Sequence, residues 1–142
     1  MKFDYNKKEF TQEEKEILLK ESKALLEKYP ERIPLLVQLD SNVLKLEKHK
    51  FLVNDDININ YYIDVLKTKL IHINSNDSLT ISLTKFNDDG TKTMTRIKPQ
   101  SKLLKEFYQE NKDPSTGMLI FTVSRQTTVK WVKGLASYYL GY

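Results

Sequence analysis

The sequence of 142 residues contains no cysteine, which excludes disulfides, cysteine nucleophiles and thiolate metal sites. Its two histidines, His49 and His72, are too few for a metal cage built from several imidazoles. All four glycines are isolated, so no glycine-rich loop is available to cradle a phosphate. The longest nearly apolar run, residues 118–123, is far shorter than the ~20 residues that span a bilayer. We therefore expect a soluble, single-domain, cytoplasmic protein that has no metal ion or cofactor and is not an enzyme.

The charge of the chain is only mildly positive. The 23 lysines and arginines outnumber 19 acidic residues, which gives a net charge of +4, and the two signs are interleaved. A nucleic-acid-binding surface usually concentrates its positive charge on one face, so we expect no nucleic-acid partner. A small basic nucleic-acid-binding domain is the alternative from another class, and its binding would weaken steeply with salt.

The first half of the chain predicts a helix, two strands and a second helix. Thr11 stands three residues before Glu14, the spacing of a capping box, and the helix that follows should end before Pro30. Arg32–Leu39 alternates apolar residues, and residues 50–53 form a second candidate strand. Asp55 and Asp56 are candidate N-caps for the helix that follows. Its apolar residues recur at helical spacing: Ile59, Tyr62, Ile63, Leu66 and Leu70.

The second half predicts a hairpin, a helix and a final strand. Residues 79–85 alternate apolar and polar side chains, the Asn-Asp-Asp-Gly sequence at 87–90 predicts a turn, and the chain should return through 91–97. Ser101 is a candidate cap for the helix that follows. Residues 118–123 are the most apolar strand and should occupy the centre of the sheet. With two helical segments at the N-terminus, the fold class is α+β.

These segments, in this order, resemble the autophagy ubiquitin-like modifiers of the GABARAP and light-chain-three group. The similar pieces are KYPERIPLLVQ, EKHKFLV, NDDININYYIDVLKTKL, KEFYQENKD and GMLIFTVS, and the opening MKFDY is also similar to the GABARAP start. The resemblance covers about residues 1–124. It implies a ubiquitin-like β-grasp domain at 1–124, with two N-terminal helices within 1–29, and a C-terminal tail at 125–142.

The resemblance also implies the work of an adaptor. Family members present an exposed strand edge flanked by two hydrophobic pockets, where aromatic-x-x-aliphatic motifs of autophagy receptors and adaptors add a strand. The first pocket would draw on Glu21, Leu25, Pro34, Lys50, Leu52 and Met118. The second would draw on Phe51, Val53, Ile57, Tyr62 and Val65, with Lys48 and Lys69 as partners for acidic flanking residues. From the residues alone, the apolar helix stripe that contains Tyr62, Ile63 and Leu66 is more typical of a core than of a pocket.

The C-terminal tail is where the chain departs from the resemblance. Family members are trimmed to expose a glycine that conjugation enzymes join to phosphatidylethanolamine, and the aligned position here is Lys130. The candidate conjugation sites are therefore Gly134 and Gly141, which would place the protein on autophagosome or other vesicle membranes. The alternative is an unconjugated interaction module that lacks lipidation, with an aromatic tail that packs on the domain or on a membrane. We expect a monomer in both cases.

Overall fold

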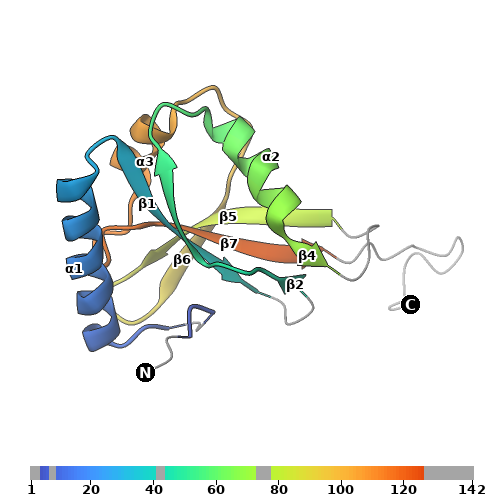
Figure 1. The fold of residues 1–142 in the computed structure, drawn as a ribbon. Helices are drawn as coiled ribbons and strands as arrows, with labels where there is room; N and C mark the ends of the chain where they lie inside the picture. The colour runs from blue at the N-terminus through green and yellow to red at the C-terminus, as the bar shows by residue number, and fades with distance from the viewer. Residues whose placement is uncertain (1–3, 7–8, 41–43, 73–77, 127–142) are drawn as a thin grey trace, which may run out of the picture.

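Three helices and seven strands follow one another in a computed structural model of the chain, which describes residues 4–6, 9–40, 44–72 and 78–126 (Figure 1). In chain order they are α1 (Gln12–Lys28), β1 (Arg32–Leu39), β2 (Leu44–Lys45), β3 (Lys50–Asn54), α2 (Ile59–Lys69), β4 (Ile71–His72), β5 (Ser78–Phe86), β6 (Lys92–Arg96), α3 (Leu104–Asn111) and β7 (Leu119–Gln126). The two-residue strands β2 and β4, which the sequence did not predict, pair with each other in a small separate sheet.

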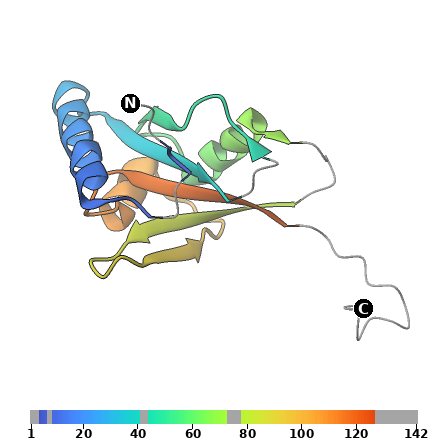
Figure 2. The same cartoon turned by 90° about the horizontal axis from the view of Figure 1, so that it is seen from below.

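The main sheet has five strands in the order β3-β1-β7-β5-β6. β7 lies at its centre, parallel to β1 and antiparallel to β5. Residues 119–123 of β7 are all buried, because helices or other segments cover both faces of the sheet, and this agrees with the apolar run in the sequence. The edges are β3 and β6, and Figure 2 shows the β5–β6 hairpin on the opposite side of the sheet from β3.

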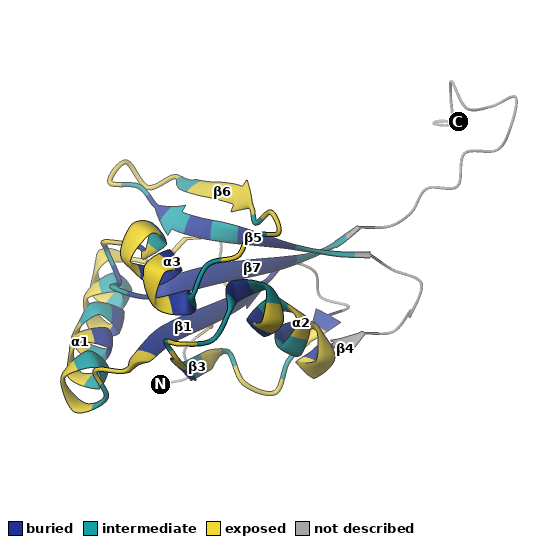
Figure 3. Cartoon of the chain, turned by 90° about the horizontal axis from the view of Figure 1, so that it is seen from above, coloured by how far each residue is buried: buried dark blue, intermediate teal, exposed yellow. Residues whose placement is uncertain are grey.

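Alternate residues of β1 face two separate cores. Ile33, Leu35 and Val37 lie in the larger core, which also contains residues of α2 and α3. Leu36 points to the other face, where the smaller core includes Leu18 of α1. The period of two along the strand thus assigns α2 and α3 to one face of the sheet and α1 to the other. Figure 3 shows that β1 and β7 are buried along most of their length, whereas β6 is largely exposed.

The helix α1 begins as the sequence predicts. Thr11 Oγ1 accepts a hydrogen bond from the Glu14 N–H (3.1 Å), and the Glu14 carboxylate accepts one from the Thr11 N–H (2.9 Å). In the described residues before it, the chain forms a turn at Tyr5 and Asn6 instead of a helix. There the Asp4 side chain accepts a hydrogen bond from the Asn6 N–H, a local bond that competes with helix formation. The described residues therefore have one N-terminal helix rather than the expected two.

The other two helices begin differently from the prediction. Asn58, not Asp55 or Asp56, caps α2, since its side chain accepts a hydrogen bond of 2.9 Å from the helix backbone. α3 begins after Leu103 without a side-chain cap, so Ser101 does not serve as one. The hairpin turn is confirmed, because Gly90 has the positive φ of 91° that favours glycine. β7 continues through Gln126, past the expected domain boundary at residue 124.

Candidate functional site

The strand β3 presents an outer edge with which no strand in the described part of the chain is paired. The Val37 N–H donates to the His49 carbonyl oxygen (2.8 Å), which places this pair among the hydrogen-bonded pairs of the antiparallel β1–β3 ladder. Hydrogen-bonded and non-hydrogen-bonded pairs alternate along such a ladder, so the backbone N–H and C=O groups of Lys50 and Leu52 point away from β1. This edge is therefore able to bond to an added strand.

A pocket of about 150 Å³ opens between β3 and α1. All six residues expected in the first pocket line it, together with two that were not expected: Glu21, Leu25, Pro34, Lys50, Leu52 and Met118, with Leu35 and Phe51. Met118 is 1% exposed and supplies the buried part of the lining, whereas Leu52 is half-buried at the strand edge. The fold thus brings together residues from α1, β1, β3 and the start of β7.

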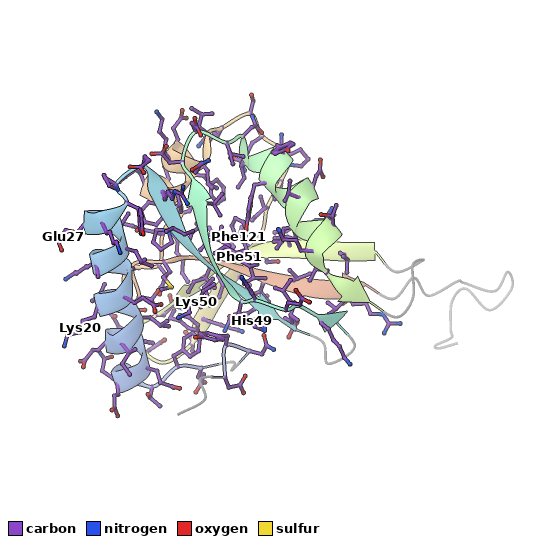
Figure 4. All side chains as sticks on the ribbon, in the orientation of Figure 1. Lys20, Glu27, His49, Lys50, Phe51 and Phe121 are labelled. Carbon is purple, nitrogen blue, oxygen red and sulfur yellow. The ribbon has the colours of Figure 1, made fainter. Side chains whose placement is uncertain are left out.

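Lys50 carries an ion pair at this pocket. Its Nζ lies 2.8 and 3.0 Å from the two carboxylate oxygens of Glu21 on α1, and Figure 4 shows Lys50 in the space between β3 and α1. Burial alone would lower the pKa of Lys50, but hydrogen bonds to Glu21 and Tyr5 and their charges raise it above its ordinary value. Both side chains of the ion pair keep more than a third of their surface exposed (37% and 35%), so the ammonium is also accessible to an incoming anion.

The N-terminal segment borders the same pocket. The Tyr5 ring stacks on His49 with centroids 5.7 Å apart, and Lys50 Nζ lies 5.4 Å from the Tyr5 ring centroid. The Tyr5 carbonyl oxygen accepts a hydrogen bond from the buried side chain of Gln38 (2.9 Å), which fixes the segment on β1. No periodic pattern in the sequence places Tyr5 or His49 at this site. The sequence signal for Tyr5 was only that it is an aromatic residue in a charged segment.

A second hollow, of about 290 Å³, lies on the other side of β3. It is lined by Leu46, Glu47, Lys48, Phe51 and Lys69. Of these, Phe51, Lys48 and Lys69 were expected from the sequence. Leu46 and Glu47 were missed, because the segment between β2 and β3 has no regular pattern. The first pocket includes Glu21 of α1 and the second hollow includes Lys69 of α2, and these two helices cover opposite faces of the sheet. The two hollows therefore lie on opposite faces, and Phe51 lines both of them.

The remaining residues expected in the second pocket do not line this hollow. Ile57 and Val65 are half-buried, whereas Val53 (9% exposed) and Tyr62 (4%) belong to the larger core. The Tyr62 ring lies 6.4 Å from the ring of Phe121, and burial raises the pKa of its hydroxyl. Among the described atoms that hydroxyl has no hydrogen-bond partner. Val53 and Tyr62 are therefore core residues that do not line this hollow, and their part in peptide binding stays a prediction.

The described residues contain neither a cluster of metal-binding side chains nor a membrane-spanning helix. Among them, no group of three or more histidine, cysteine, aspartate or glutamate side chains is arranged to hold a metal ion. Within the same residues, no helix has the length and apolar character needed to cross a membrane. The open edge of β3 and the two hollows beside it suit the binding of a peptide.

The parallel pair β1–β7 at the centre of a mixed sheet, with α2 crossing between β3 and β5, defines a ubiquitin-like β-grasp protein. Residues 18–129 match the family described as "Autophagy protein Atg8 ubiquitin like". The chain belongs to this Atg8 family.

Individual relatives agree with this assignment. Autophagy-related protein 8D of Oryza sativa subsp. japonica is 31% identical over 124 residues, which cover 86% of this chain and 93% of the relative. Autophagy-related protein 8a of Arabidopsis thaliana is 28% identical over 115 residues, covering 80% and 84%. The crystal structure of Trypanosoma brucei ATG8 has the same fold, with a TM-score of 0.59 and 22% identity over 90% of this chain and 99% of that one.

Family membership settles the general role of the protein. Atg8 proteins are ubiquitin-like modifiers and adaptors of autophagy rather than enzymes, and they are associated with autophagosomes. This chain is accordingly an autophagy modifier or adaptor whose partners are proteins such as autophagy adaptors.

Proposed function

We propose that the edge of β3 binds aromatic-x-x-aliphatic peptides by strand addition, with the aromatic side chain in the first pocket and the aliphatic one in the second hollow. The observation that carries this proposal is the position of the two hollows, on opposite faces of the sheet beside one open strand edge. Side chains three residues apart in an extended strand point to opposite faces and are separated by ~10 Å along the strand. The spacing of the motif therefore suits the arrangement of the hollows.

The lining of the first pocket favours an aromatic side chain. Met118 contributes a flexible, polarizable thioether, which adapts to rings of different shape and makes favourable contacts with them. Lys50 adds an ammonium group at the rim, able to lie over the face of a bound ring. Leu25 and Pro34 complete an apolar lining around these two groups.

The charges near the edge favour motifs with acidic flanking residues. Lys48 and Lys69 line the second hollow and are exposed, and Lys50 is accessible at the first pocket. A carboxylate on the bound peptide would gain attraction from these ammonium groups, chiefly as a faster association rate and a more specific register. The same lysines discourage two β3 edges from pairing with each other.

The proposed function includes attachment to membranes through the C-terminal tail. Processing by a protease would expose Gly134 or Gly141, and conjugation enzymes would join that glycine to phosphatidylethanolamine. Both glycines lie outside the described residues. The monomeric protein would then divide between the cytoplasm and autophagosome or other vesicle membranes. The second candidate is an unconjugated module that keeps the peptide groove.

Calorimetric titration with a synthetic aromatic-x-x-aliphatic peptide tests the groove. Leu52→Ala and Phe51→Ala should each weaken binding about tenfold, the effect of losing one apolar contact. Ile17→Ala is the matched control, because Ile17 is an exposed apolar residue of α1 that lines neither hollow. Circular dichroism should show that all three variants remain folded. Unchanged affinity in both β3 variants would place the peptide elsewhere.

A further inference from the structure

The strand β6 forms a second open edge, at the opposite side of the main sheet from β3. The Asn87 N–H donates to the Thr91 carbonyl oxygen (2.8 Å), and the Ile97 N–H donates to the Ile81 carbonyl oxygen (3.0 Å), so these pairs lie in the hydrogen-bonded series of the β5–β6 ladder. Hydrogen-bonded and non-hydrogen-bonded pairs alternate along this ladder. The backbone N–H and C=O groups of the even-numbered residues of β6 therefore point outwards, away from β5.

These outward-facing residues include Met94 and Arg96, which are both exposed. In the part of the chain that the structure describes, no strand pairs with this side of β6. Figure 3 shows β6 at the rim of the molecule, largely exposed and away from the helices over β1 and β7. The backbone of β6 is therefore positioned to bond to an added strand, as the backbone of β3 is.

Two hollows adjoin the end of β6, and both are lined by Arg96, Ile97 and Lys98. One, of about 580 Å³, lies towards α2 and is also lined by Ile63. The other, of about 420 Å³, lies towards α3 and is also lined by Phe107. An extended segment that runs along β6 and past Ile97 would therefore find apolar surface for its own side chains.

The charges around this edge are mainly positive. The two hollows are lined by four basic and two acidic residues: Lys67, Arg96, Lys98, Lys102, Asp64 and Glu110. Lys102 forms an ion pair with Glu110, but among the described residues neither Arg96 nor Lys98 forms one. The exposed guanidinium and ammonium groups are thus available to the carboxylates of a partner.

We propose that β6 is a second strand-addition site, independent of β3, whose partner is an extended segment with alternating acidic and apolar residues. The even-numbered side chains Met94 and Arg96 lie on one face of β6, and Thr95 lies on the other with Leu83 beside it. On an added strand, acidic residues on the first face meet Arg96, and apolar residues on the second face meet the hollows. A partner strand in which acidic and apolar residues alternate is therefore complementary to both faces of β6.

A second copy of this chain fits the edge poorly. Antiparallel pairing of two β6 strands about Met94 would place Lys92 of one copy beside Arg96 of the other, and like charges directly opposite are destabilising. Basic side chains on an edge strand generally prevent this kind of self-association. The charge that discourages a second copy attracts an acidic strand, so charge complementarity selects a partner protein.

The test is titration of the full chain with a short synthetic peptide that alternates glutamate and valine, followed by the NMR shifts of backbone amides. The amides of Met94 and Arg96 should shift, and those of Lys50 and Leu52 should not. Met94→Pro removes one outward N–H without breaking the β5–β6 ladder, and it should weaken binding at least about fivefold, as expected for one hydrogen bond. Leu52→Pro, the matching change on β3, should leave this peptide's affinity unchanged.

Two further measurements complete the test. Arg96→Glu should weaken binding of the same peptide about tenfold and make that binding less sensitive to salt. Because this variant keeps every backbone N–H, it tests the proposal even where Met94→Pro fails to fold. An aromatic-x-x-aliphatic peptide should bind Met94→Pro normally, so failure at β6 is distinguishable from failure of the groove on β3. Shifts confined to β3, self-association at the β6 edge, or equal affinity for a peptide that alternates lysine and valine would overturn the proposal.

Discussion

Gly117 lies directly against Ser22, since a Cβ on Gly117 would stand 2.4 Å from the Ser22 hydroxyl oxygen. That hydroxyl is buried between α1 and the loop before β7, 2.8 Å from the Thr116 carbonyl oxygen. Gly117 also has a φ of +69°, a conformation that other residues rarely adopt. Because Met118 follows immediately and lines the first pocket, the approach of α1 to this loop also sets the position of the pocket.

Gly117→Ala should therefore lower the free energy of unfolding by about 2–4 kcal/mol, from backbone strain and overpacking against Ser22 combined. Gly90→Ala is the matched control. Gly90 also has a positive φ (+91°), but no atom lies within 4 Å of an added Cβ. Gly90→Ala should therefore lower the free energy of unfolding by only about 1 kcal/mol. Urea denaturation of both variants makes the comparison. Equal losses would show that close packing against Ser22 contributes nothing.

Regular elements were predictable from local pattern. The alternation of Arg32–Leu39 gave a strand with the observed bounds, and the pair Thr11 and Glu14 gave the start of α1. The central position of β7 followed from its apolar run, since only a strand covered on both faces has that composition. Six of the eight residues that line the first pocket were named from the family resemblance, because their positions depend on elements that the resemblance also covers.

Features that depend on tertiary contacts were not predictable. Asn58 caps α2 although Asp55 and Asp56 have suitable side chains, since the choice depends on where β3 ends. The spacing of Tyr62 favours a core residue, whereas the family resemblance implies a pocket residue, and the packing of α2 on the sheet buries it. The segment at Tyr5 and Asn6 is held on β1 by hydrogen bonds from the Gln38 side chain and the Leu39 N–H, and neither contact has a local pattern in the sequence.

The ion pair between Glu21 and Lys50 should limit how strongly Lys50 attracts a peptide. Glu21→Gln removes the competing carboxylate, so a motif with an acidic residue before its aromatic position should bind roughly threefold more tightly. A motif with a neutral residue there should bind as before, and the stability should change by less than about 1 kcal/mol because the pair is exposed.

Titration calorimetry with the two peptides makes this measurement. Glu110→Gln is the control for Glu21→Gln, because it breaks the ion pair with Lys102, which lines neither hollow beside β3. Weaker binding of the acidic peptide to Glu21→Gln would mean that the ion pair orders Lys50 for binding rather than competing with the peptide.

The two buried tyrosines should respond in opposite ways to loss of their hydroxyl groups. Tyr62→Phe should leave the free energy of unfolding unchanged or raise it, because the Tyr62 hydroxyl is buried without a partner among the described atoms. Tyr108→Phe should lower it by about 1 kcal/mol, because the Tyr108 hydroxyl donates a 2.6 Å hydrogen bond to the Gly117 carbonyl oxygen. Urea denaturation at neutral pH compares them. Equal losses would mean that the Tyr62 hydroxyl has a partner in solution.

The same tyrosines predict a loss of stability in alkali. Burial raises the pKa of both hydroxyls in the folded state, whereas in the unfolded chain they ionise near pH ~10. The unfolded state therefore releases protons first, and stability falls as the pH rises above about 10. The double variant Tyr62→Phe with Tyr108→Phe should show a smaller fall than the wild-type protein. Denaturation midpoints on either side of pH ~10 supply the test, and parallel curves would contradict it.

The mass of the mature protein should identify the conjugation site in the C-terminal tail. Gly134 is the nearer of the two glycines to the end of β7, so we expect processing to remove residues 135–142 and a phospholipid to be joined to Gly134. Intact mass spectrometry of the protein from autophagy-competent eukaryotic cells should then show that loss, with a lipid-sized gain in the membrane fraction. Gly134→Ala should abolish the gain, whereas Gly141→Ala should not. The reverse pattern would assign Gly141, and a full-length, unmodified mass in every fraction would support the unconjugated module, which keeps the groove on β3.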